Sequence, residues 1–171
     1  MADFIIEVLS RDQIRSVYPL VREAFPTLGL SAWLRFARQL TGLRRGGQCG
    51  IVAARREGRA FPSGLFCYRV EDDLKLGKVL IADHFVAVDL LDPASVLTAL
   101  VEELDGLAKR LGCRAVRSLV HGGAPEVEGG LVAAGHRPEG ASLLLKKLLE
   151  TPRVRGTGPH VGPRMPSSAT G

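Results

Sequence analysis

Apolar positions recur along the chain with two different periods, which divide it into predicted strands and helices. The run Phe4 to Val8 predicts a short strand that ends at Ser10. Two segments with helical spacing follow, the first ending before Pro26 and the second running from about Ser31, as N-cap, to Gly42. Their apolar positions are Ile14, Val17, Tyr18, Val21 and Phe25 in the first and Trp33, Leu34, Phe36, Ala37 and Leu40 in the second. The predicted opening is therefore one strand followed by two helices.

The middle of the chain has the pattern of β-structure. Residues 49–55 and 65–70 are strand-like on either side of a turn at 56–59, which predicts an antiparallel hairpin. A longer β-rich run, 78–89, has apolar residues on both faces. Such a run is typical of a strand covered on both sides, so it is predicted to be the central strand of the sheet.

The strongest helical signal begins at Pro93 and continues to Gly112. Its apolar stripe consists of Val96, Leu97, Leu100, Val101, Leu104, Leu107, Ala108 and Leu111. Asp92 is a favourable N-cap and proline a favourable first helical residue, so the sequence defines the start of this helix well. A strand-like run, 113–120, follows. Strand, helix and strand together predict a right-handed parallel crossover.

A short helix from about Pro125 to Ala134 and a last strand, Ala141 to Leu148, close a predicted domain of residues 1–150. Residues 151–171 are rich in Gly, Pro, Ser and Thr and contain three arginines and no acid, so they are predicted to form a disordered basic tail. The tail holds most of the net charge of +5, which disfavours nucleic acid as a partner of the domain itself. The alternative, a tail that binds nucleic acid or an acidic partner, stays open.

Composition is that of an ordinary globular domain, with 46% hydrophobic and 24% charged residues. No apolar run approaches the roughly 18 residues that span a membrane, and the first residues lack the basic start of a signal peptide. We therefore expect a cytoplasmic protein with no membrane partner. Cys49, Cys67 and Cys113 are widely separated and lack a metal-binding spacing, so they are predicted to be reduced, buried thiols, and no metal is expected.

The order of these elements resembles the GNAT superfamily of N-acetyltransferases. Residues 107–113 look like that family's helix end and turn, 133–136 stand where it usually has a Gly-Phe pair, and 143–148 look like its final strand. The resemblance covers roughly residues 4–149. It implies an α/β fold whose mixed central sheet joins an antiparallel hairpin to a parallel strand-helix-strand crossover, flanked by helices. It also implies acetyl transfer from acetyl-CoA to a small-molecule or peptide amine, and it is compatible with a homodimer.

In that family the CoA pyrophosphate binds backbone N–H groups at the start of the main helix, next to small residues. The matching positions here depart from the family pattern: Asp92 replaces Arg or Gln, Ser95 replaces the first Gly, and Leu97 replaces the last small residue. A capping carboxylate uses one of the amides that phosphate needs, and Pro93 has no amide. The residues that the resemblance places next to CoA are Val86, Val88, Ser95, Val96 and Leu97.

The reaction also requires a base, since a free amine is protonated near neutral pH. Asp83 and His84 are an ionisable pair within the central strand, and strand alternation predicts opposite faces, so that only one meets the substrate. His121 is a third candidate, because the family's two central strands separate near the end of the parallel strand. The family's tyrosine acid would fall near Leu131.

Besides the binding role of the tail, two functions of the domain remain open at this point. The first is a CoA-dependent N-acyltransferase, which follows from the element order and the candidate bases. The second is a non-catalytic module that retains the fold to bind a partner or small ligand, which the residues at the start of the main helix favour.

Overall fold

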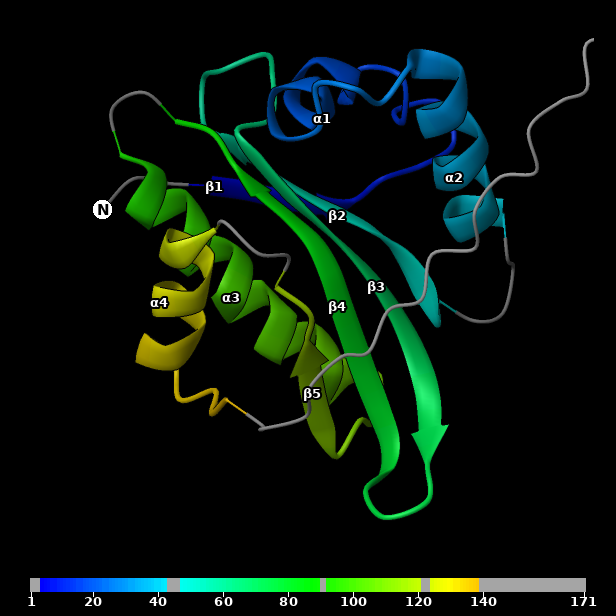
Figure 1. Cartoon of the computed structure of the whole chain (residues 1–171), viewed down its shortest axis with the longest axis vertical. Helices are drawn as coiled ribbons and strands as arrows, with labels where there is room; N and C mark the ends of the chain where they lie inside the picture. The colour runs from blue at the N-terminus through cyan, green and yellow to red at the C-terminus, as the bar shows by residue number, and fades with distance from the viewer. Residues whose placement is uncertain (1–3, 43–46, 90–91, 121–123, 139–171) are drawn as a thin grey trace, which may run out of the picture. The chain divides into compact units, whose positions relative to one another are not determined.

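The structure, a computed structural model, describes residues 4–42, 47–89, 92–120 and 124–138, all within the compact unit Met1–Pro138. The elements are β1 (Phe4–Val8), α1 (Tyr18–Ala24), α2 (Leu30–Gly42), β2 (Cys49–Arg56), β3 (Gly64–Asp73), β4 (Gly77–Ala87), α3 (Pro93–Arg110), β5 (Ala115–Ser118) and α4 (Pro125–Ala133) (Figure 1). This order confirms the predicted one as far as α4. The predicted strand 141–148 and the predicted tail 151–171 lie outside the described residues.

The five strands form one sheet in the order β1-β2-β3-β4-β5. The first four pair antiparallel, and β5 pairs parallel with β4. The predicted mixed sheet, with its hairpin and its strand-helix-strand crossover, is therefore confirmed. Helices cover both faces: α3 and α4 pack on one, the α3 face, and α1 and α2 on the other, the α1–α2 face (Figure 1). Among the described helices, none is long and apolar enough to cross a membrane.

Strand alternation divides the core between these two faces. On β2, Val52 and Ala54 face α3, whereas Ile51 and Ala53 face α1 and α2. Helix α3 approaches the sheet closely at Gly64, where an added Cβ would lie 2.6 Å from the Val96 side chain. Glycine at this position therefore permits the contact that seats the start of α3 on the sheet.

The first helix is shorter than its apolar spacing predicts. Residues 11–17 form turns, and α1 begins only at Tyr18, with Pro19 in its first turn. A helix that began near Ile14 would hold this proline in its interior, where the missing N–H and the ring disrupt the helix. Helix α2 begins at Leu30, so Ser31 lies inside the helix and is not its N-cap.

The cysteines only partly match the prediction of buried thiols. Cys67 is buried, whereas Cys49 and Cys113 are partly exposed. None of the three, all of which lie in the described part of the chain, forms a disulfide.

A β-bulge in β4 shifts the alternation halfway along the strand. Leu65 pairs with Val86 and Cys67 with Asp83, so the single residue between them on β3 faces two on β4. One of these two, His84, has a φ of 53°, in the left-handed region that non-glycine residues seldom adopt. After the bulge, odd-numbered residues of β4 therefore face the side of the sheet that even-numbered residues face before it.

The shift is visible in the core. Before the bulge, Leu80 and Ala82 face α3. After it, Phe85 and Ala87 pack on that face, although simple alternation would have turned them away. The bulge therefore decides where the candidate catalytic side chains point.

Candidate active site

The pairing of β4 with β5 ends at Ala82 and Ser118. The backbone N–H of Leu119 donates to the Ala82 carbonyl at 2.8 Å, and no described residue continues the pairing. Ser118 Oγ is buried here and has no hydrogen-bond partner within the described ranges. The fork between β4 and β5 therefore opens where Asp83 and His84 begin the bulge.

Asp83 and His84 form a hydrogen-bonded pair at this fork. Asp83 Oδ1 lies 2.7 Å from His84 Nδ1. The prediction that the two side chains point to opposite faces is therefore wrong, because the left-handed backbone of the bulge turns His84 to the side of its predecessor. The Asp83 side chain is only 12% exposed, whereas that of His84 is 34% exposed.

Arg69 completes a short chain of charged groups. Its Nη1 donates to Asp83 Oδ2 at 2.9 Å, and its Nε donates to Glu71 Oε1 at 2.6 Å. Sequence reasoning missed Arg69, because it lies on β3 and only the register of the hairpin brings it diagonally opposite Asp83. Both carboxylate oxygens of Asp83 thus have a partner.

The environment of Asp83 favours its ionised form. Burial raises the pKa of this carboxyl, but the hydrogen bond and charge of His84 and then those of Arg69 outweigh it, so the pKa lies below the usual value. An ionised carboxylate only accepts hydrogen bonds, so His84 Nδ1 carries the hydrogen of this bond, and in the neutral form of the ring the lone pair lies on Nε2. The pair therefore has the arrangement of a histidine base that is oriented by a carboxylate.

Cys67 lies beside this pair, and the three residues could in principle hold a metal ion. One ligand atom from each of Cys67, Asp83 and His84 lies within 4.8 Å of the others. Burial and then the charge of Asp83 raise the pKa of the Cys67 thiol, which disfavours the thiolate that a metal or a nucleophilic mechanism needs. The Arg69 guanidinium on Asp83 opposes a second cation at the same place.

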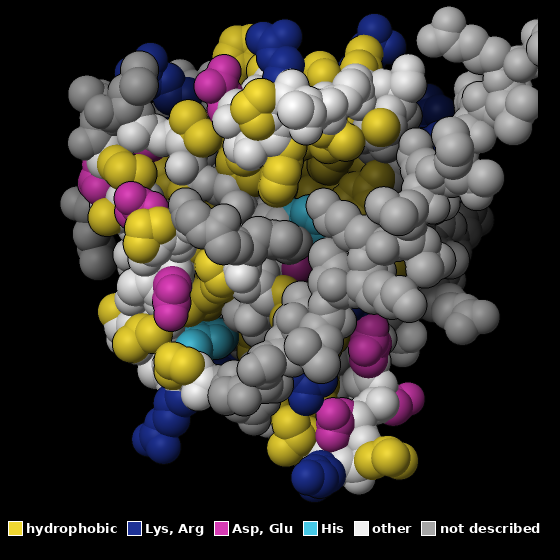
Figure 2. Space-filling view, in the orientation of Figure 1, with side chains coloured by type: hydrophobic (Ala, Val, Ile, Leu, Met, Phe, Trp, Pro, Cys, Tyr) yellow, Lys and Arg dark blue, Asp and Glu magenta, His cyan; other side chains and the backbone are white. Residues whose placement is uncertain are grey.

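A pocket of about 540 Å³ opens on the α1–α2 face above His84. Its lining consists of Val21, Phe25, Thr27, Leu28, Ala32, Trp33, Arg35, Phe36, Gln39, Leu65 and His84. The His84 ring lies 6.0 Å from the Phe25 ring and 5.2 Å from the Phe36 ring, measured between centroids. Figure 2 shows hydrophobic side chains gathered around a hollow under the α1–α2 helices, in the upper half of the view. The sequence marked these aromatic residues only as core positions of two helices.

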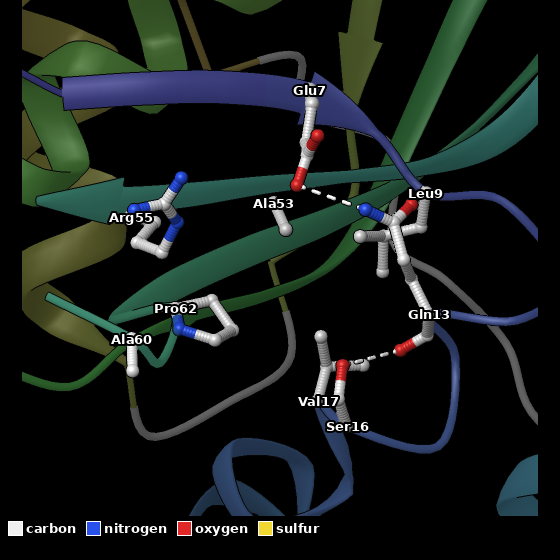
Figure 3. A pocket seen from close by; sticks show the side chains of 9 residues that line it. All are labelled: Glu7, Leu9, Gln13, Ser16, Val17, Ala53, Arg55, Ala60 and Pro62. Atoms are coloured by element: carbon white, nitrogen blue, oxygen red, sulfur yellow. Dashed lines mark hydrogen bonds between the residues drawn. The ribbon is translucent and has the colours of Figure 1, made fainter. Parts of the chain in front are cut away.

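A second, smaller hollow of about 360 Å³ lies between β1, β2 and the turns before α1 (Figure 3). Its polar side chains bond mostly to one another. Gln13 Nε2 donates to Glu7 Oε1 at 3.1 Å, and Ser16 Oγ donates to the Gln13 carbonyl at 2.7 Å, as the dashed lines in Figure 3 show. Of the predicted catalytic residues, the two that the structure describes, Asp83 and His84, do not line it.

The start of α3 is capped as predicted. Asp92 Oδ1 accepts from the Ser95 backbone N–H at 3.1 Å, and its Oδ2 accepts from the Ser95 hydroxyl. These bonds lower the pKa of Asp92. Because Pro93 has no N–H and that of Ser95 is used, two of the first three helical residues offer no amide to a phosphate. Asp89 and Arg56, joined at 3.1 Å, place a further acid and a cation close to this turn.

The other residues predicted next to CoA have packing or backbone partners. Val86 and Val96 are buried, and so is Leu97, whose side chain fills the space beside Gly130 on α4. Val88 is exposed just after β4, and its N–H donates to the Ser63 carbonyl at 2.7 Å. They lie around the start of α3 and the end of β4, mainly with apolar side chains.

Two further sequence candidates can be placed only in part. His121 lies outside the described residues. Leu131, near which the resemblance places the family's tyrosine acid, is buried against α3 in α4 and offers no proton.

Comparison with known proteins gives matches in structure alone. No family model matches the sequence, and no curated protein matches it. An aminoglycoside N-acetyltransferase in complex with CoA is similar with a TM-score of 0.70 at 12% identity, covering 86% of this chain and 96% of that one. Glucosamine-6-phosphate N-acetyltransferase from Arabidopsis thaliana is similar with a TM-score of 0.65 at 15% identity, covering 86% and 99%. Ribosomal-protein-alanine N-acetyltransferase from Brucella melitensis biovar Abortus 2308 is similar with a TM-score of 0.68 at 12% identity, covering 85% and 100%.

Proposed function

We propose that this chain, which has the GNAT N-acetyltransferase fold, transfers an acetyl group from acetyl-CoA to a small-molecule or peptide amine, with His84 as the base. The observation that carries the proposal is the hydrogen bond between Asp83 and His84 at the bulge, where β4 leaves β5 and the large pocket opens. The similar fold of three N-acetyltransferases with different acceptors supports the reaction class and leaves the acceptor open.

The proposed step begins with the amine. An acceptor amine reaches the site protonated and must lose a proton before its nitrogen can attack. His84 Nε2 takes that proton, while Asp83 holds the ring through Nδ1 and stabilises the imidazolium that forms. Arg69 keeps Asp83 ionised and oriented, so it is a positioning residue and does not contact the reacting atoms.

The acetyl group is then transferred from the sulfur of CoA to the amine nitrogen. The amine nitrogen attacks the thioester carbonyl carbon, the new C–N bond forms, and the C–S bond breaks to release the thiolate of CoA. A thiolate is a tolerable leaving group without an acid. It takes up the second proton, which the attacking nitrogen loses as the amide forms, and the proton held on His84 passes to solvent. This balance needs no tyrosine at the position of Leu131.

Binding of the CoA pyrophosphate is the weak part of the arrangement. Asp92 occupies the amide of Ser95 and adds a negative charge where phosphate would lie. We therefore propose weak binding of CoA at the start of α3, with Arg56 as the nearby cation. Val86, Val88, Ser95, Val96 and Leu97 remain the residues that we propose next to CoA, on position alone.

A transfer assay tests the proposal. The full chain is incubated with acetyl-CoA and a panel of amines, and the thiol of released CoA is measured. At least one amine is expected to release thiol at a rate proportional to enzyme, with the acetylated amine found by mass spectrometry. His84→Asn is expected to abolish this rate. Thiol release that is independent of amine, or equal in the variant, would contradict the proposed role of His84.

A non-catalytic binding module is the second candidate, favoured by the capped start of α3. It predicts that no amine releases thiol even when millimolar acetyl-CoA is present. Replacing residues 92–95 by Arg-Gly-Ala-Gly separates the two functions, because a catalytic chain should gain CoA affinity and keep its transfer activity. A non-catalytic module should show no transfer activity, whether or not its affinity for CoA increases.

A further inference from the structure

The pocket above His84 is built mainly from rings and aliphatic side chains. Phe25 and Phe36 contact the His84 ring, and Trp33 lies 6.1 Å from Phe36 between centroids. Leu28 and Leu65 add aliphatic surface. A lining of this kind binds an apolar body, and a volume of about 540 Å³ accommodates a small molecule with one aromatic ring.

The charges around the pocket are uneven. Its described lining contains the guanidinium of Arg35 and no carboxylate. The nearest acid of the catalytic pair, Asp83, lies behind His84 and is bonded to both His84 and Arg69. Arg35 is exposed on α2 and has no ion-pair partner among the residues that the structure describes. The pocket thus offers one cation, and it lacks a group that would neutralise a second ammonium on the acceptor.

We propose that the acceptor is a primary monoamine that carries an aromatic group and a carboxylate, the chemistry of an aromatic amino acid. The ring packs against Phe25 and Phe36, the carboxylate binds Arg35, and the amine lies at His84. This inference rests on the proposed function for its last contact only. A polyamine is excluded, because its additional ammonium groups would meet Arg35 and apolar surface.

Trp33 supplies a direct readout, because it is the single tryptophan of the chain and lines the pocket. Fluorescence of the full chain is titrated with phenylalanine, phenethylamine and spermine, each with and without CoA. Phenylalanine is expected to change the emission saturably, phenethylamine to bind roughly fivefold more weakly for want of the carboxylate, and spermine to have no saturable effect.

Two arginine variants test whether Arg35 causes the preference for a ligand with a carboxylate. Arg35→Gln is expected to remove the roughly fivefold advantage of phenylalanine over phenethylamine. Arg38→Gln, an exposed position on the same helix outside the lining, is expected to retain it. Tighter binding of spermine than of phenylalanine, an advantage that survives in Arg35→Gln, or no saturable response to any of the three would overturn the inference.

The transfer assay separates this inference from the function beneath it. Saturable binding of phenylalanine without thiol release from acetyl-CoA would leave the ligand class standing and remove the acetyltransferase. Thiol release with spermine but not with phenylalanine would retain the acetyltransferase and remove the ligand class. The failure of the proposed ligand class and the failure of the proposed acetyltransferase function therefore give different results.

Discussion

Asp83 Oδ1 lies 2.7 Å from His84 Nδ1, although consecutive residues of a regular strand point to opposite faces. The left-handed backbone of His84, with φ of 53°, brings the two side chains together. This conformation costs a non-glycine residue about 1 to 3 kcal/mol and persists only where surrounding structure holds it. Here β3 on one side and the rings of Phe25 and Phe36 on the other hold it.

Replacing His84 by Asn should abolish catalysis without unfolding the protein. Asn is among the residues that adopt the left-handed region readily, so the bulge should survive and the melting temperature should change little. Loss of a general base should lower kcat/KM by about a hundredfold or more. Transfer rates and thermal unfolding of the same sample provide the measurement.

The control is His136→Asn, because His136 lies after α4 and pairs with Asp105 at 3.7 Å, away from the pocket lining. Its transfer rate should match that of the unaltered chain. A His84→Asn variant that is folded and fully active would remove His84 from the mechanism.

Asp83 should stabilise the fold in a pH-dependent way. Its pKa is lower in the folded chain than the ordinary 3.8, so its contribution is present above that value and is lost as the pH falls through the folded pKa. Asp83→Asn should therefore lower the free energy of unfolding by about 1 to 2 kcal/mol at pH 7. The difference between the two proteins should shrink as the pH falls below about 3.8 in urea titrations.

Asp72→Asn is the matched control on the neighbouring strand, since Asp72 is an exposed residue of β3. It should leave the free energy of unfolding close to that of the unaltered chain at both pH values. A difference for Asp83→Asn that stays constant from pH 7 to pH 3 would show that Asp83 acts through its shape and not through its charge.

Asp92→Asn should improve binding of CoA. Asn caps helices about as well as Asp, so the variant keeps the helix start and removes only the negative charge that opposes the pyrophosphate. CoA affinity by calorimetry should rise roughly three- to tenfold. Glu102→Gln removes a charge from an exposed position further along α3 and should have little effect. An equal increase in CoA affinity in both variants would show that the net charge of the chain, and not the cap at Asp92, limits binding.

Adjacent glycines of α4 should respond in opposite ways to alanine. At Gly129 an added Cβ meets no described atom within 4 Å, so Gly129→Ala should stabilise by up to about 1 kcal/mol through helix propensity. At Gly130 it would lie 2.5 Å from Leu97 Cδ2, so Gly130→Ala should destabilise by about 1 to 3 kcal/mol. Thermal unfolding decides, and equal shifts at both positions would contradict the packing of α4 on Leu97.

Sequence pattern was sufficient for the layers of this fold because period and capping are local properties. The stripe of α3 and the cap at Asp92 are both present in the structure. The exceptions have local causes that a simple period does not contain. Pro19 shortens the first helix, and one extra residue on β4 moves Phe85 to the face opposite the expected one.

The site was harder to predict because its parts are distant in sequence. Asp83 and His84 stood out as ionisable residues in an apolar strand, yet their contact depends on the bulge. Arg69 reaches Asp83 only through the hairpin register, and Arg35 lines the same pocket as His84 only because α2 covers that face of the sheet. Such contacts depend on tertiary packing, so the periodic pattern of apolar residues in the sequence does not predict them.

Protection against thermal unfolding by acetyl-CoA tests the central claim most directly. A ligand at 100 times its dissociation constant adds about 2.7 kcal/mol, which for a domain of this size raises the melting temperature by roughly 5 to 10 °C. We predict a rise that grows with acetyl-CoA concentration in the full chain and is larger in Asp92→Asn. An unchanged melting temperature at millimolar acetyl-CoA in both proteins would contradict an acetyl-CoA-dependent function.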